Sequence, residues 1–178
     1  MKVRIAAQAY HLRYVPADDR ILLSVDLSPE CELSVPITRR LTRSLVMGLA
    51  KLLSDRAQLS TPDDPRLRET MLDFQHSQSV ADALAKGTMR EEARQKPLTV
   101  PAKPVRTVNI LEKPNGAITL MFDTSEQVLT VDVAPQRIHV VLSTFLRMAD
   151  RAGWDFPPIA SWLEASKDVG GAAGRVVN

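Results

Sequence analysis

Few side chains in this sequence are arranged in a way that could do chemistry, and the most suggestive are two aspartates. Asp26 and Asp123 each follow a run of alternating apolar residues, and each begins an Asp-x-Ser sequence. If the two runs pack about a twofold axis, the carboxylates could converge as an acid–base or cation site. Turn capping alone accounts for both, since Asp and Ser side chains accept backbone N–H groups after strands. We therefore favour turn capping and predict no catalytic, cofactor-binding or metal-binding residue.

The other candidate nucleophile and metal ligands give no stronger signal. Cys31 lies between Glu30 and Glu32, and flanking carboxylates raise the pKa of a thiol, so a small strand residue is favoured over a nucleophile. Three histidines lie on three different predicted elements, with no second ligand at helical spacing: His11, His76 and His139. Metal binding is therefore not expected.

A basic cluster could contact an acidic partner or a nucleic-acid backbone. Arg39, Arg40 and Arg43 begin a predicted helix, where the dipole disfavours positive charge. A solvated basic face is the commoner explanation for such a cluster. Stacking of bases needs exposed aromatic side chains on a sheet, and only Tyr10 and Tyr14 on the first predicted strand qualify.

Two apolar features could instead bind a protein. A thin apolar stripe, Leu67, Met71 and Phe74 with Val80, Ala81 and Leu84, lies on a predicted helix whose residues 75–79 are polar. This pattern is typical of a partner surface rather than a core helix. Trp162 ends an aromatic cluster that starts at Trp154. Closure of the core is the favoured role of this cluster, and a partner anchor is the alternative.

Composition and charge restrict the protein class. The chain has 178 residues, of which 44% are hydrophobic and 25% charged, so wholesale disorder is excluded. A single cysteine excludes an internal disulfide framework. A net charge of +2 is far from that of an obligate duplex-DNA binder. No charge-free stretch approaches the roughly 20 residues that span a bilayer.

The elements that must position these residues occur twice in the sequence. Residues 20–28 resemble 117–125, with alternating apolar residues that run into Asp-x-Ser. After a one-residue slip, 32–37 resemble 128–133, and the apolar helical pattern of 45–53 returns at 141–149. An internal duplication accounts for this similarity, and chance resemblance of two amphipathic units is the alternative.

These patterns predict an α+β fold of duplicated antiparallel β-meander-plus-helix units. Strands are expected at 2–15, 20–27 and 31–36, then at 105–112, 117–123 and 127–133, with helices at 38–56 and from Pro135 to about 151. The expected regions are a first repeat at 1–60, a helical segment at 61–95, a Pro-rich linker at 96–104, a second repeat at 105–166 and a flexible tail at 167–178.

The functional prediction is a non-enzymatic protein-interaction or adaptor protein that acts through sheet edges and helix faces. The alternative is a single-stranded nucleic-acid-binding protein that uses the basic first helix and the sheet face. We expect a protein partner, with a second copy of the chain as one candidate, no cofactor and no membrane association. One cysteine and no export signal favour the cytoplasm.

Overall fold

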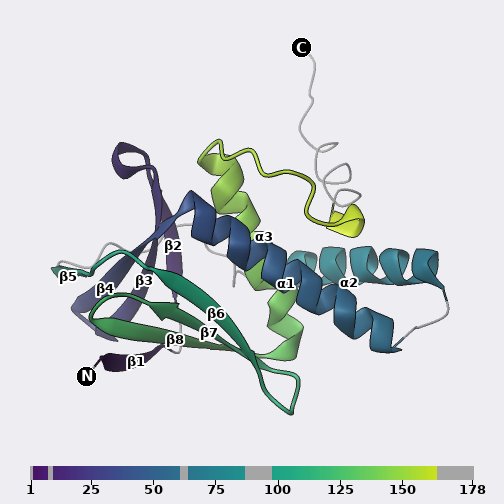
Figure 1. Ribbon diagram of the computed structural model, residues 1–178, viewed down its shortest axis with the longest axis horizontal. Helices are drawn as coiled ribbons and strands as arrows, with labels where there is room; N and C mark the ends of the chain where they lie inside the picture. Colours follow the sequence, from purple (N-terminus) through teal and green to yellow (C-terminus); the bar gives the residue numbers. More distant parts are fainter. Residues whose placement is uncertain (1, 8–9, 61–63, 87–97, 164–178) are drawn as a thin grey trace.

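The computed structural model describes residues 2–7, 10–60, 64–86 and 98–163, and they form an α+β fold (Figure 1). The three main helices are α1 (Arg39–Ser60), α2 (Pro65–Ala85) and α3 (Ile138–Arg151), and short 3-10 helices span Pro16–Asp18 and Pro135–Arg137. The strands are β1 (Val3–Ala7), β2 (His11–Val15), β3 (Arg20–Ser28), β4 (Cys31–Thr38), β5 (Leu98–Pro101), β6 (Thr107–Glu112), β7 (Ile118–Asp123) and β8 (Gln127–Val133).

Local sequence signals account for several element boundaries. The Asn-Gly turn between β6 and β7 places Gly116 at a φ of 79°, which favours glycine, and its N–H donates to the carbonyl of Lys113. The Asp64 side chain caps α2 by accepting the N–H groups of Arg66 and Leu67, and Pro65 occupies the first turn. Both boundaries therefore follow from residues within the turn or the first turn of the helix.

The strands form two four-stranded sheets, in the orders β1-β8-β7-β6 and β2-β3-β4-β5. Each sheet contains a three-stranded antiparallel meander that leads into a helix: β2-β3-β4 into α1, and β6-β7-β8 into α3. Each sheet also has one parallel edge strand. The connectivity expected of residues 20–53 and 117–149 is therefore found.

The two parallel edge strands come from the opposite half of the chain. β1 precedes the first meander but pairs with β8, and β5 precedes the second meander but pairs with β4. The prediction of one long strand over residues 2–15 is therefore wrong, because the chain leaves one sheet after β1 and enters the other at β2. The prediction of a Pro-rich linker also missed β5, since an edge strand tolerates Pro101.

Both meanders pair their last two strands in the same register. The residues that the sequence aligned face equivalent partners along the whole hairpin. The matching pairs are Ile21–Ile37 and Ile118–Val133, Leu23–Val35 and Leu120–Val131, and Val25–Leu33 and Phe122–Leu129. All of these side chains are buried, so in both sheets the same alternate positions face the core.

The helices complete one hydrophobic core. Figure 1 shows the strands on one side of the molecule and the helices on the other, with α1 crossing α3. Each helix contacts the edge strand of the other meander, α1 on β6 and α3 on β2. Gly48 permits the first contact, because a Cβ there would lie 3.0 Å from the Ile110 side chain. Buried equivalents such as Leu49 and Phe145 lie in the same core.

Some predictions lie outside the described residues. The expected tail at 167–178 is one of them, and so is the chain between Lys86 and β5. Among the described residues, none of the helices combines the length and apolar character that a membrane crossing requires.

Candidate functional site

The two aspartates lie in different sheets and have different partners. Asp123 at the end of β7 forms an ion pair with Lys2, and Asp26 on β3 is exposed opposite Glu32 of β4. In the turns that follow, Ser28 Oγ accepts the N–H of Glu30, as the Asp-x-Ser pattern predicts, and Thr124 caps the β7–β8 turn. The two carboxylates lie in separate sheets and do not form a catalytic pair.

The basic cluster and the two tyrosines do not form a base-stacking surface. Arg39 donates to the carbonyl of Asp155 at 2.8 Å, while Arg40 and Arg43 are exposed. Burial raises the pKa of the Tyr10 hydroxyl, which lies inside the protein. Tyr14 lies edge-on to the Trp154 ring, with centroids 6.0 Å apart. The aromatic surface expected on the first strand is therefore occupied by the protein's own contacts.

Asp19 connects the first sheet to the segment after α3. Its Oδ1 accepts from Trp154 Nε1 at 2.7 Å and from the Tyr14 hydroxyl at 3.0 Å. These two hydrogen bonds lower the pKa of Asp19, the bond from Trp154 having the larger effect. The Asp19 backbone has a φ of 47°, which is uncommon outside glycine. The arrangement fixes the chain after α3 against β2 and is structural.

Trp162 lies in the interior rather than on the surface, so the alternative role of an exposed partner anchor is wrong. It is 3% exposed, and its Nε1 donates to Ser54 Oγ of α1 at 3.2 Å. Its ring packs edge-on against His76 of α2 and His139 of α3. Trp162 therefore joins the three helices at one point.

The same junction brings together two histidines that sequence spacing placed apart. The rings of His76 and His139 have centroids 5.5 Å apart, and both residues are buried. In the part of the chain that the structure describes, neither Nδ1 atom has a hydrogen-bond partner. The two residues lie on separate helices, so no spacing rule could reveal the pair.

Both histidines of the junction are held in the neutral form. Burial, with a smaller contribution from the nearby His76, lowers the pKa of His139 to about 4. Burial also lowers the pKa of His76, and the charge of Asp73 partly opposes this. Within the described ranges, no group of three or more His, Cys, Asp or Glu residues could hold a metal ion. The pair is therefore a packing feature that acid would disturb.

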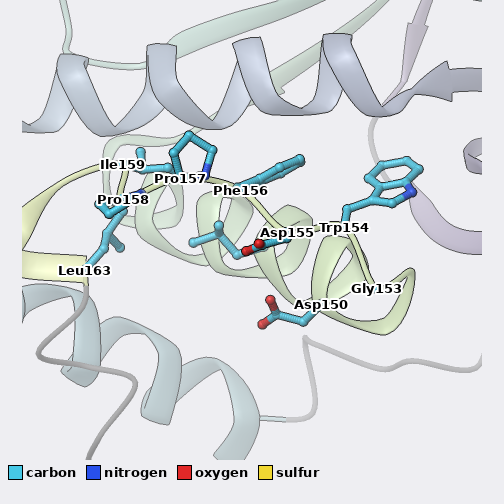
Figure 2. A pocket seen from close by; sticks show the side chains of 10 residues that line it. Asp150, Gly153, Trp154, Asp155, Phe156, Pro157, Pro158, Ile159 and Leu163 are labelled. Atoms are coloured by element: carbon cyan, nitrogen blue, oxygen red, sulfur yellow. The ribbon is translucent and has the colours of Figure 1, made fainter.

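A pocket of about 400 Å³ lies between α3 and the segment that follows it (Figure 2). Its walls are mainly apolar and include Trp154, Phe156 and Pro158, and Figure 2 shows the carboxylates of Asp150 and Asp155 beside them. Asp150 is exposed at the end of α3. The pocket could admit an apolar group, but it has no convergent set of polar groups that would select a ligand.

The outer face of α2 is the clearest candidate for binding. Its inner face contributes Leu72, His76 and Ala83 to the interior, whereas large apolar side chains on other faces are exposed. Leu67 is 47% exposed, Met71 40% and Phe74 65%. Continuing the same spacing of four and three residues defines the outer stripe, all of it exposed: Leu67, Met71, Phe74, Gln78, Ala81 and Ala85.

No known protein family, curated protein or solved structure matches this chain.

Proposed function

We propose that this protein is a non-enzymatic, cytoplasmic protein-interaction module that binds an apolar-faced α-helix on the outer stripe of α2. The outer stripe carries the proposal, because α2 has two apolar faces and the core covers only one of them. A stripe with alternating spacings of four and three residues is the pattern that packs against a second helix. An exposed Phe74 and Leu67 in that pattern are typical of an interface.

The rest of the chain acts as the support for α2. The shared connectivity and pairing register support an internal duplication, in which two meander-plus-helix units exchange their first strands. Such an exchange interlocks the two units, because each sheet needs a strand from the other half. The core-facing side chains of the two units are buried, so we do not favour a chemical role for these units.

Site-specific photo-crosslinking in the source cell tests the proposal. A photoreactive amino acid at Gln78, on the outer stripe, should form a protein adduct, and the same amino acid at Glu30 in the β3–β4 turn should not. Phe74→Glu should reduce the Gln78 adduct at least about tenfold, because a charge in an apolar helix seam is costly. Arg66→Glu adds the same side chain beside the stripe and serves as the matched control.

The outcomes separate the two function classes. No protein adduct at Gln78, or one that Phe74→Glu leaves unchanged, would overturn the proposal. Tight, salt-sensitive binding of short single-stranded oligonucleotides, lost when Arg39, Arg40 and Arg43 are all changed to Gln, would instead support the nucleic-acid alternative.

A further inference from the structure

We infer that the helix bound on the outer stripe is α2 of a second copy of this chain, packed antiparallel to the first. This inference rests on the proposed function and names its partner. Along the outer stripe and its flank, large side chains and a positive charge come first, and smaller side chains and a negative charge come later. A second α2 that runs in the opposite direction therefore complements the first.

Side-chain size along the outer stripe favours antiparallel self-pairing. The large residues, Leu67, Met71 and Phe74, lie in the first half of α2, and the smaller Gln78, Ala81 and Ala85 lie in the second half. In an antiparallel pair that centres near residue 76, the large residues of one copy face the smaller residues of the other. The layers are Leu67 with Ala85, Met71 with Ala81 and Phe74 with Gln78.

A parallel pair would place large residues on large residues at one end and alanine on alanine at the other. The alanine layers would then leave voids, since helices of uniform separation cannot fill both ends. Reversal of the second helix lets every layer contain one large and one smaller side chain.

Charge on one flank of the outer stripe gives the same orientation. Arg68 follows Leu67 and Asp82 follows Ala81, so both lie on the same side of the stripe. Antiparallel packing brings Arg68 of each copy opposite Asp82 of the other, which forms two opposite-charge pairs. Parallel packing would place this flank of the two copies on opposite sides of the seam, so neither opposite-charge pair would form.

The rest of the fold is compatible with this dimer. The inner face of α2, including Leu72 and His76, stays on α1 and α3 while the outer stripe faces solvent. Pairing therefore needs no rearrangement of the core. A seam of two helices of this length is small, so we expect a dissociation constant on the order of micromolar.

Sedimentation of the full chain over a concentration series tests self-association. We expect a reversible change from the 19.7 kDa chain to twice that mass. Phe74→Glu should raise the dissociation constant at least about 30-fold, and Arg66→Glu should change it less than about threefold. Arg68→Glu alone should weaken the dimer roughly fivefold, and Arg68→Glu with Asp82→Arg should restore it.

Cysteine pairs test the orientation in a Cys31→Ser background. Leu67→Cys with Ala85→Cys should give a disulfide-linked dimer on mild oxidation with diamide, since each cysteine then faces its complement in the other copy. Leu67→Cys alone should not, because the antiparallel arrangement separates the two copies of that residue by on the order of 27 Å. Both positions of substitution in α2 are exposed, so unchanged circular dichroism is expected and confirms folding.

A chain that stays monomeric up to about millimolar concentration would overturn the dimer. Dimers that cross-link through Leu67→Cys alone would overturn the antiparallel orientation. If sedimentation shows a monomer but Gln78 forms a Phe74-dependent adduct with a different protein, the self-pairing fails and the proposed function stands. If neither a dimer nor an adduct forms, both fail.

Discussion

The body of the fold, formed by the two sheets with α1 and α3, differs from α2 in how far its helices are buried. In α3, nine of 14 residues are buried, whereas in α2 only three of 21 are, so α3 belongs to the core and α2 lies on its surface. The inner face of α2 is covered by the body, whereas its outer stripe is exposed. From this difference we expect stability to be concentrated in the body, while α2 leaves apolar surface exposed.

α2 is attached to α1 and α3 through its inner face. Leu72 and His76 pack inward, Glu69 accepts a hydrogen bond from the Ser161 hydroxyl, and Trp162 lies against His76. A helix held in this way should open more easily than α3. Four predictions test the contrast between the body and α2.

The largest effect is expected in the core of the body. Phe145→Ala should reduce the free energy of unfolding by about 3–5 kcal/mol, because this side chain is fully buried between sheet and helices. Leu49→Ala, at the aligned position in α1, should cost about 2–5 kcal/mol. Urea denaturation measures both. A loss below about 1 kcal/mol at Phe145 would show that the body does not carry the stability.

The next largest effect is the acid sensitivity of the attachment of α2. The folded pKa of His139 is about 4, below its ordinary 6.5, so protons bind more tightly when the junction opens. The stabilisation is complete above about pH 6.5 and is lost as the pH falls toward 4, by at most roughly 3 kcal/mol. Asp73 on α2 and Trp162 face the pair, and Trp162 in turn donates a hydrogen bond to Ser54 of α1.

Hydrogen exchange of α2 at pH 7 and pH 5 measures this acid sensitivity. Exchange in α2 should accelerate at pH 5, after correction for intrinsic rates, before exchange in β3 and β7 does. His139→Phe should reduce the pH dependence of exchange in α2. His11→Gln, which lies outside the junction, should leave that pH dependence unchanged. Equal acceleration throughout the chain would contradict the separate behaviour of α2.

A smaller effect is expected at the start of α2. Asp64→Ala removes the side chain that accepts the N–H groups of Arg66 and Leu67 and should destabilise the helix by about 1 kcal/mol. Asp64→Asn retains a capping side chain and is the matched control. Hydrogen exchange should show the loss in α2 only. A loss that spreads to the sheets would mean that α2 and the body unfold as one unit.

The smallest effect is expected on the outer stripe. Phe74→Ala should change the stability of the monomer by less than about 0.5 kcal/mol, because the side chain is exposed. Leu72→Ala, two residues away on the inner face, should cost about 2–4 kcal/mol. Urea denaturation at concentrations below self-association compares the two. Similar losses would show that the two faces of α2 are not distinct.

Much of the local structure could be predicted from particular residues. The alternation around Leu23 and Leu120 indicated strands with one buried face, and Asn115-Gly116 marked the β6–β7 turn. The stripe of Leu67, Met71 and Phe74 indicated an exposed apolar face on a helix. These signals are short-range, because they depend on residue spacing within one element or turn.

Sequence rules did not predict which distant segments of the chain pair with each other. Nothing in residues 3–7 shows that β1 joins β8 instead of its neighbour β2, since any apolar edge strand satisfies either partner. The sequence spacing of His76 and His139 likewise does not predict their contact. The sequence around Trp162 does not show which helix packs against it. The prediction of one strand over residues 2–15 failed for this reason, whereas Trp162 lies in the core, as the favoured prediction stated.

The sequence by itself determined the two meanders and their helices, the buried faces of their paired strands and the exposed apolar residues of α2, because side-chain periodicity fixes which residues share a face. Only the tertiary structure decided which strands exchange between the sheets and which face of α2 the core covers. Those choices depend on the packing of segments that lie far apart in the chain, where several arrangements bury similar apolar area and shape complementarity selects one.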